Sequence, residues 1–431
     1  MCNALIHFGV SILIYQRKLA DRNLFYLVAG LVLTFITIAI PVQLDGNWVT
    51  LLWVCEAALL FWLGRTKNVF FYEKLSYALM ILAFFSLIQD WSTVYNVYNR
   101  DQPDTRITPL LNINFLTSLL FIASFGFINV LNRNPKYPSP LISQKGILRL
   151  VSVLIPAILL IVLFGSFWME ISTYWNQLYQ DSKTLIKGQN ADYFDVYRDT
   201  DLLKFKTIWI INYVLLFVSL LSFFNIKKLK DSDLGIVNLV FGTLVLLVFL
   251  IQGLYFLGVL RESYLAQTLS EHYLRSSFNI GIRYISFALV GLVLFSVYNS
   301  IRQDFMKKVS LDLSEAFDIL LYTTLIWIAS SELINWMDII KFTQSYKLGL
   351  SILWGVCALI LIALGIWKKK KHLRIGAFAL FGVTLVKLFF YDISHLDTIA
   401  KTIVFVALGI LLLIISFLYN KYKHLISEEV K

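Results

Sequence analysis

The stretch TLLWVCEAALLFWLGRT, residues 50–66, decides the fold class of this chain. Its only charged residue before Arg65 is Glu56, and no proline interrupts it. A helix of this length extends about 25 Å, close to the hydrocarbon thickness of a bilayer, at 1.5 Å per residue. The run therefore predicts a helix that crosses a membrane.

The composition of the whole chain agrees with this prediction. The 431 residues are 58% hydrophobic and only 15% charged, with a mean hydropathy of +0.72, whereas soluble domains carry about 25% charged residues. The cysteines Cys2, Cys55 and Cys357 are far apart, so neither a disulfide framework nor a zinc site is predicted. No cofactor motif is recognisable, and the net charge of +11 is interpreted as membrane topology rather than nucleic-acid binding.

Similar apolar runs recur along the chain and predict an all-α, polytopic transmembrane helix bundle of about 13 segments. A transmembrane barrel is not expected, because barrel strands alternate in polarity and these runs do not. Residues 1–431 are taken as one transmembrane domain with a long outer loop at 169–204. The predicted segments are 4–15, 24–42, 48–64, 75–90, 110–131, 147–168, 205–224, 234–258, 278–300, 312–331, 346–366, 375–390 and 399–419.

The loops between these segments alternate in charge. The loops after odd-numbered segments, with the C-terminal tail, hold 23 basic and 7 acidic residues, and the other loops hold 9 basic and 15 acidic residues. Basic loops face the cytoplasm in most membrane proteins. The pattern predicts a multi-pass membrane protein, with its C-terminus in the cytoplasm and the N-terminus of this chain outside.

Two stretches of the chain resemble each other. The run at 50–66 and the run SILWGVCALILIALGIW at 351–367 share a tryptophan eleven residues before a glycine. This spacing favours a parallel internal repeat of units 24–90 and 326–392, and the alternative is convergence of two apolar helices. Gly64 and Gly365 are predicted to occupy left-handed positions at the ends of their helices.

Ionisable residues inside apolar segments are the first group of candidate site residues. Glu56 lies midway through its segment, where an ionised carboxylate facing lipid is costly. Lys387 and Arg283 are its candidate partners. The alternative is a neutral or paired glutamate that only fixes helix packing.

A second group of polar residues collects at the predicted outer face. Glu332 and Asp338 follow segment 312–331, and the stretch KLFFYDISHLDTIAKTI, residues 387–403, contains Asp392, His395 and Asp397. Carboxylates with a histidine can relay protons or act as general acid and base. The alternative is that polar residues such as Asp397 only cap helices.

Three blocks of the chain resemble a bacterial family of membrane proteins called domain of unknown function 2339. They are IPVQLDGNWVTLLWVCEAALLFWLG at 40–64, SELINWMD at 331–338 and LRIGAFALFGVTLVKLFFYDISHLD at 373–397. The resemblance implies a polytopic bacterial inner-membrane protein and no particular reaction.

Three functions are compatible with these observations. The first is a transporter or flippase for a small or envelope-related solute, with Glu56, Lys387, Arg283, Glu332 and Asp338 as its charged site. The second is a membrane-embedded transferase acting on an envelope glycan or lipid-linked substrate, with Asp392, His395 and Asp397 as catalytic groups and an aromatic outer loop as platform. The third is a structural or sensory scaffold, so the sequence does not decide whether the protein is an enzyme. The predicted partners are the bilayer and an envelope glycan, lipid or small solute.

Overall fold

The computed structural model describes residues 46–388 apart from 96, 142–144, 188–193, 307–312 and 342–345, with scattered positions in 30–44 and 399–417. The chain divides into two compact units, residues 1–206 and 207–431. Each unit is described by itself, and the single transmembrane domain stays a prediction.

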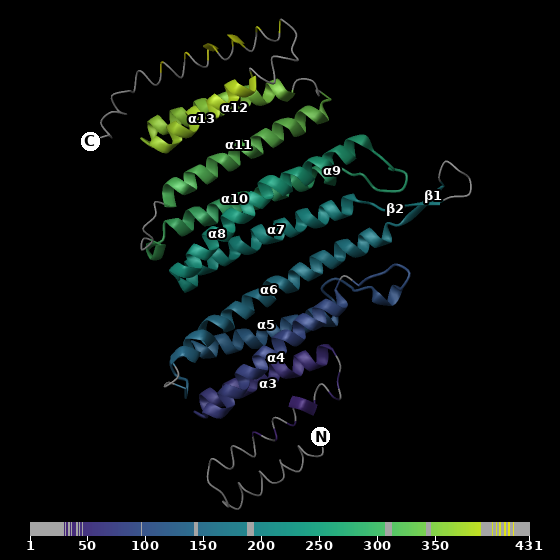
Figure 1. Ribbon diagram of the computed structural model, residues 1–431, viewed down its shortest axis with the longest axis vertical. Helices are drawn as coiled ribbons and strands as arrows, with labels where there is room; N and C mark the ends of the chain where they lie inside the picture. Colours follow the sequence, from purple (N-terminus) through teal and green to yellow (C-terminus); the bar gives the residue numbers. More distant parts are fainter. Residues whose placement is uncertain are drawn as a thin grey trace, which may run out of the picture. The chain divides into compact units, whose positions relative to one another are not determined.

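Most described residues of unit 1 are helical (Figure 1). Its elements are α3 (Asn47–Thr66), α4 (Phe70–Val94), the short 3-10 helix η1 (Pro103–Thr105), α5 (Ile113–Asn132), α6 (Lys145–Asp181), β1 (Thr184–Lys187) and β2 (Phe194–Tyr197).

Unit 2 is also helical, and α7 (Asp201–Phe224) crosses the boundary between the units. The remaining elements are the π-helix η2 (Asn225–Leu229), α8 (Ser232–Val248), the π-helix η3 (Phe249–Gly253), α9 (Leu254–Ala266), α10 (Phe278–Ile301), the 3-10 helix η4 (Asp304–Met306), α11 (Leu313–Ile339), α12 (Tyr346–Trp367) and α13 (Lys371–Lys387).

The helical fold class is confirmed. Each predicted segment from 48–64 to 375–390 corresponds to helix, and nine helices within the described residues are long and apolar enough to span a membrane. The first, second and last predicted segments lie wholly or largely outside the described residues, so the total of about 13 stays a prediction.

The predicted outer loop at 169–204 is shorter than expected. Helix α6 continues to Asp181, and an antiparallel hairpin pairs Thr184 with Tyr197 before α7 begins at Asp201. Residues 169–181 contain no glycine or proline, and Glu170 is 4% exposed and accepts a 2.6 Å hydrogen bond from the hydroxyl of Tyr95. Burial of this polar contact and the lack of helix breakers extend the helix beyond its apolar part.

In unit 1, α3 packs along α4 and α5, and α5 packs along α6 (Figure 1). Their shared core is built from buried aliphatic and aromatic side chains, and Ala57 and Phe61 of α3 are completely buried in it. Phe121 and Phe125 of α5 stack with ring centroids 4.5 Å apart. Close packing of this kind is what holds helices together in lipid, because lipid is as apolar as the core.

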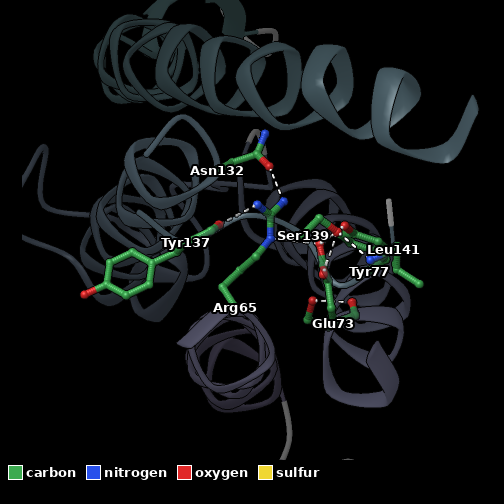
Figure 2. A network of polar contacts seen from close by, with 8 residues as sticks. Arg65, Glu73, Tyr77, Asn132, Tyr137, Ser139 and Leu141 are labelled. Atoms are coloured by element: carbon green, nitrogen blue, oxygen red, sulfur yellow. Dashed lines mark hydrogen bonds and ion pairs between the residues drawn. The ribbon is translucent and has the colours of Figure 1, made fainter. Parts of the chain in front are cut away.

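A buried ion pair closes one end of unit 1 (Figure 2). Arg65 Nε donates to Glu73 Oε1 over 2.9 Å, and the two side chains are 4% and 0% exposed. Glu73 also accepts from the hydroxyls of Tyr77 at 2.6 Å and Ser139 at 2.9 Å, while Arg65 Nη2 donates to Asn132 Oδ1 at 2.6 Å. The end of α3, the start of α4 and the end of α5 therefore meet on one side, as the predicted alternation requires.

The prediction that Gly64 and Gly365 adopt left-handed conformations is wrong. The left-handed positions in these turns are Asn68 and Lys369, with φ of 55° and 54°. The two glycines lie inside the last helical turn, where a Cβ would come within 2.7 Å of the backbone nitrogen of Glu73 and 3.1 Å of that of Arg374. Glycine is needed at both positions because the following helix approaches closely, not because of its own φ.

The hairpins α3–α4 and α12–α13 share their contacts as well as their turns. Thr50 and Ser86 bring their hydroxyl oxygens within 2.6 Å. The residues 301 positions later are Ser351 and Lys387, and Lys387 Nζ donates to Ser351 Oγ over 2.8 Å. A parallel duplication would produce this correspondence, and the repeat of units 24–90 and 326–392 stays a prediction.

Candidate functional site

Helix α11 has an unusual inventory of buried side chains. The residues of this helix that are buried are Asp318, Thr324 and Asn335, all of them polar. Most of its apolar side chains are partly or fully exposed, Trp327 and Trp336 among them. In a membrane-spanning helix this pattern indicates that the polar side chains face the neighbouring helices and the apolar side chains face lipid.

One end of α11 forms ion pairs with the neighbouring helices. Glu332 accepts from Arg283 Nη1 of α10 over 3.1 Å, and Arg283 Nη2 also reaches the hydroxyl of Ser331 at 3.3 Å. Asp338 pairs with Arg261 Nη2 of α9 over 2.7 Å. The arginine side chains are 2% and 5% exposed, whereas the carboxylates of Glu332 and Asp338 are 20% and 22% exposed. Buried cations are thus held by carboxylates that retain partial access to solvent.

Two buried polar groups at this end lack a hydrogen-bond partner among the described residues. They are both side-chain atoms of Asn335, which is completely buried, and Nε of Arg261. Asn335 lies three residues from both Glu332 and Asp338, so the three share one side of the helix. Buried polar atoms in folded proteins are nearly always paired, with a protein group, a water or an ion, so these unpaired atoms require an explanation.

The opposite end of α11 carries a second charged cluster. Asp318 is bound by Lys370 Nζ and lies 2.9 Å from His372 Nε2, and both of these residues lie at the start of α13. Asp318 and Asp338 are about 30 Å apart along the helix at 1.5 Å per residue. This separation is similar to the thickness of the hydrocarbon layer of a bilayer, about 30 Å.

Two cavities follow α11 between these clusters. Cavity A has a volume of about 470 Å³ and runs from Asp318 to Ser330, and cavity B, of about 480 Å³, continues to Ile334. Both are lined by Trp327 and Ser330, and the hydroxyl of Ser330 accepts a 2.8 Å hydrogen bond from Trp354 Nε1. Arg261 and Arg283 line cavity B together with the apolar residues Leu250, Ile251, Leu254, Tyr255 and Val259.

Cavities of this size hold small molecules, for which about 300–1,000 Å³ is usual. The lining contains two buried cations, serine hydroxyls and aromatic rings, which suit an anionic group attached to an apolar body. No three His, Cys, Asp or Glu side chains among the described residues could hold a metal ion together.

The structure brings together three of the predicted site residues, Arg283, Glu332 and Asp338. Glu332 is the carboxylate bound to Arg283, and Arg261, which sequence reasoning missed, joins Asp338 to the site. Arg261 lies just beyond the apolar segment 234–258, so it was assigned to a loop. Asp318 lies within segment 312–331 and carries the same signal as Glu56, a charge inside an apolar segment, but the sequence reasoning did not single it out.

Glu56 belongs to unit 1 and has a local partner. Its Oε1 accepts from the hydroxyl of Thr37 over 2.9 Å, while Oε2 is buried without a partner among the described residues. A cavity of about 400 Å³ in unit 1 is lined by Trp53, Ser86 and Asp90 among others, but not by Glu56. Arg283 and Lys387 belong to unit 2, so pairing of Glu56 with either stays a prediction.

The predicted catalytic residues Asp392, His395 and Asp397 lie outside the described residues. The aromatic platform predicted for 169–204 stays untested as a binding surface. One of its members, Trp175, stacks on Phe205 with ring centroids 5.5 Å apart, so this ring packs within unit 1.

The apolar helices, the buried ion pairs between them and the charged clusters at their ends define a polytopic α-helical membrane protein. The chain belongs to the family described as predicted membrane protein (DUF2339), whose model matches residues 3–422. No curated protein and no solved structure matches the chain.

Proposed function

We propose that the protein is a transporter whose solute moves along α11, between α9 and α10 on one side and α12 and α13 on the other. The observation that carries this proposal is the pair of cavities along α11 whose linings share Trp327 and Ser330. Together they follow one helix across most of the distance between Asp318 and Asp338. A scaffold protein has no need for such a route.

The ion pairs at the ends of α11 support the same function. The carboxylates of Glu332 and Asp338 are partly exposed while their arginine partners are buried. A solute that competes for an arginine would exchange one ion pair for another and would leave no buried charge uncompensated. Exchange of this kind would allow the route along α11 to open at one end and then at the other.

The charge of the loops supports an orientation for this route. The cluster of Asp318, Lys370 and His372 lies at the end of unit 2 that carries the basic loops. By the positive-inside rule this end faces the cytoplasm of a bacterial inner membrane, and the arginines of cavity B face outward. Cavity B would then be the entrance or exit on the outside.

The proposal is tested by the accessibility of Ser330, which lines both cavities. Ser330→Cys is prepared in a variant whose native cysteines are replaced by alanine. It is then treated with membrane-impermeant methanethiosulfonate ethylsulfonate in right-side-out and in inverted vesicles. We expect labelling from both sides, because an alternating-access route must expose its midpoint to each compartment in turn.

Ile360→Cys is the matched control. Ile360 lies in α12, is 52% exposed and does not line either cavity, so it should remain unlabelled from both sides. Labelling of Ser330→Cys from one side only, or from neither, would contradict the transport proposal. The transferase alternative depends on Asp392, His395 and Asp397 and stays a prediction.

A further inference from the structure

We infer that cavity B binds an anionic amphiphile, with its phosphate or carboxylate group at Arg261 and Arg283 and its apolar chain along η3 and α9. This inference rests on the proposed function, because it names the class of solute that the transporter would carry. It is carried by three observations that do not depend on transport: the buried cations, the unpaired polar atoms and the apolar wall.

The cations are arranged to contact a molecule in the cavity. Both arginines line cavity B, whereas the carboxylates that hold them, Glu332 and Asp338, do not. The one acidic side chain in the lining is Glu262, which also pairs with Arg261 Nη2 over 3.3 Å but is 68% exposed and therefore screened by solvent. A solute in the cavity thus meets two buried positive charges, and guanidinium groups prefer carboxylate and phosphate partners.

The unpaired polar atoms indicate that the cluster is incomplete in the structure as described. Arg261 donates from Nη2 to Glu262 and Asp338, but its buried Nε has no partner among the described residues. An arginine offers five N–H donors in a fixed fork, and an oxyanion can accept two of them side by side. A phosphate or carboxylate oxygen at Nε would satisfy this donor.

The part of the lining formed by η3 and the start of α9 is apolar and reaches the exterior of the helices. Leu250 and Ile251 belong to the π-helix η3, and Leu254 and Tyr255 begin α9. Ile251 and Tyr255 are each 65% exposed, so the apolar lining of the cavity is continuous with exposed apolar surface. Single π-helical turns inside membrane helices occur frequently at functional sites. An acyl chain could follow this wall while the charged head remains at the arginines.

Binding is measured on the full chain, purified in dodecyl maltoside and stripped of lipid, by the shift of its thermal unfolding temperature during titration. The probes are dioleoylphosphatidylglycerol, oleate, dioleoylphosphatidylcholine and glycerol 3-phosphate. We expect saturable stabilisation by the phosphatidylglycerol, by oleate or by both, because a ligand that binds the folded state raises its stability. Stabilisation by only one of the two identifies the head group as phosphate or carboxylate.

Two variants connect binding to this cavity. Arg261→Gln removes one cation and should weaken anionic amphiphile binding about tenfold or more, whereas Arg302→Gln, an exposed arginine outside the lining, should not. Gly258→Leu fills the apolar wall, and its Cβ meets nothing within 4 Å, so the variant should fold yet lose binding. Gly291→Leu is its control, with the same open surroundings outside the cavity.

Several outcomes would overturn the inference. They are equal binding of the phosphatidylcholine, equal binding of glycerol 3-phosphate, no saturable binding, or no loss in Gly258→Leu. Loss of amphiphile binding with Ser330→Cys still labelled from both sides would refute the solute class and leave transport intact. Binding that survives while Ser330→Cys is unreachable would refute transport and leave the site intact.

Discussion

Removal of one partner of the buried ion pair in unit 1 should destabilise the protein strongly. Arg65→Met would leave the carboxylate of Glu73 at zero exposure, with only the hydroxyls of Tyr77 and Ser139 as donors. It would also leave Oδ1 of Asn132 without its 2.6 Å hydrogen bond. An uncompensated buried charge is the costly consequence, because its desolvation is no longer offset.

The magnitude follows from the burial of both side chains. Loss of one partner of a buried pair costs about 3–5 kcal/mol. Glu73→Met should cost a similar amount, because it leaves the buried guanidinium of Arg65 uncompensated. The double variant buries no charge at all, so its cost should fall short of the sum of the single costs by about 3 kcal/mol.

The assay is reversible unfolding in mixed micelles of increasing sodium dodecyl sulfate, followed by near-ultraviolet circular dichroism. Arg133→Met is the control, since Arg133 is exposed at the same end of α5 and should change stability by less than about 0.5 kcal/mol. Two results would refute the reasoning: single variants whose stability lies within about 1 kcal/mol of the parent, or additive costs in the double variant. The limit is set at ~1 kcal/mol because that is the average cost of a point mutation.

Two further predictions concern packing and topology. Gly64→Ala and Gly365→Ala should each destabilise the protein by about 1–3 kcal/mol in the same unfolding assay, because the new methyl group meets the neighbouring helix. Gly382→Ala, with nothing within 4 Å, should be neutral or stabilising by up to about 1 kcal/mol, and equal effects at all three would contradict the close-approach argument. Reporter fusions at Lys228 and Gln189 should label from opposite compartments, the first from the cytoplasm. Labelling from the same compartment would contradict the predicted orientation.

Hydropathy predicted the helices well because lipid leaves the backbone few alternatives. A run such as 278–300 must satisfy its amides internally, so its length and polarity suffice to identify α10. The ends of helices depend on other contacts, and they were less predictable. Helix α6 extends to Asp181 through a polar stretch whose partners lie far away in the sequence, including Tyr95.

The site was predictable only as a set of unusual residues. The cost of a charge in an apolar segment marked Arg283 as functional or paired, but its partner depends on how α10 and α11 are rotated against each other. That rotation is a property of side-chain packing, and hydropathy carries no information about it. The assignment of Arg261 to a loop had the same origin, since its burial by α11 is decided in three dimensions.

The hairpins α3–α4 and α12–α13 are similar in helix-crossing geometry but differ in their charged side chains. A shared turn and a glycine at the point of closest approach determine how two helices cross, so contacts farther along, such as Thr50 with Ser86, follow from that geometry. The chemistry carried by this frame differs, because Lys387 stands where the first hairpin has Ser86. If duplication produced the frame, the charges were placed separately in each unit. Charge substitutions at corresponding positions of the two hairpins should therefore differ in their effect on stability, whereas Gly64→Ala and Gly365→Ala should have similar effects.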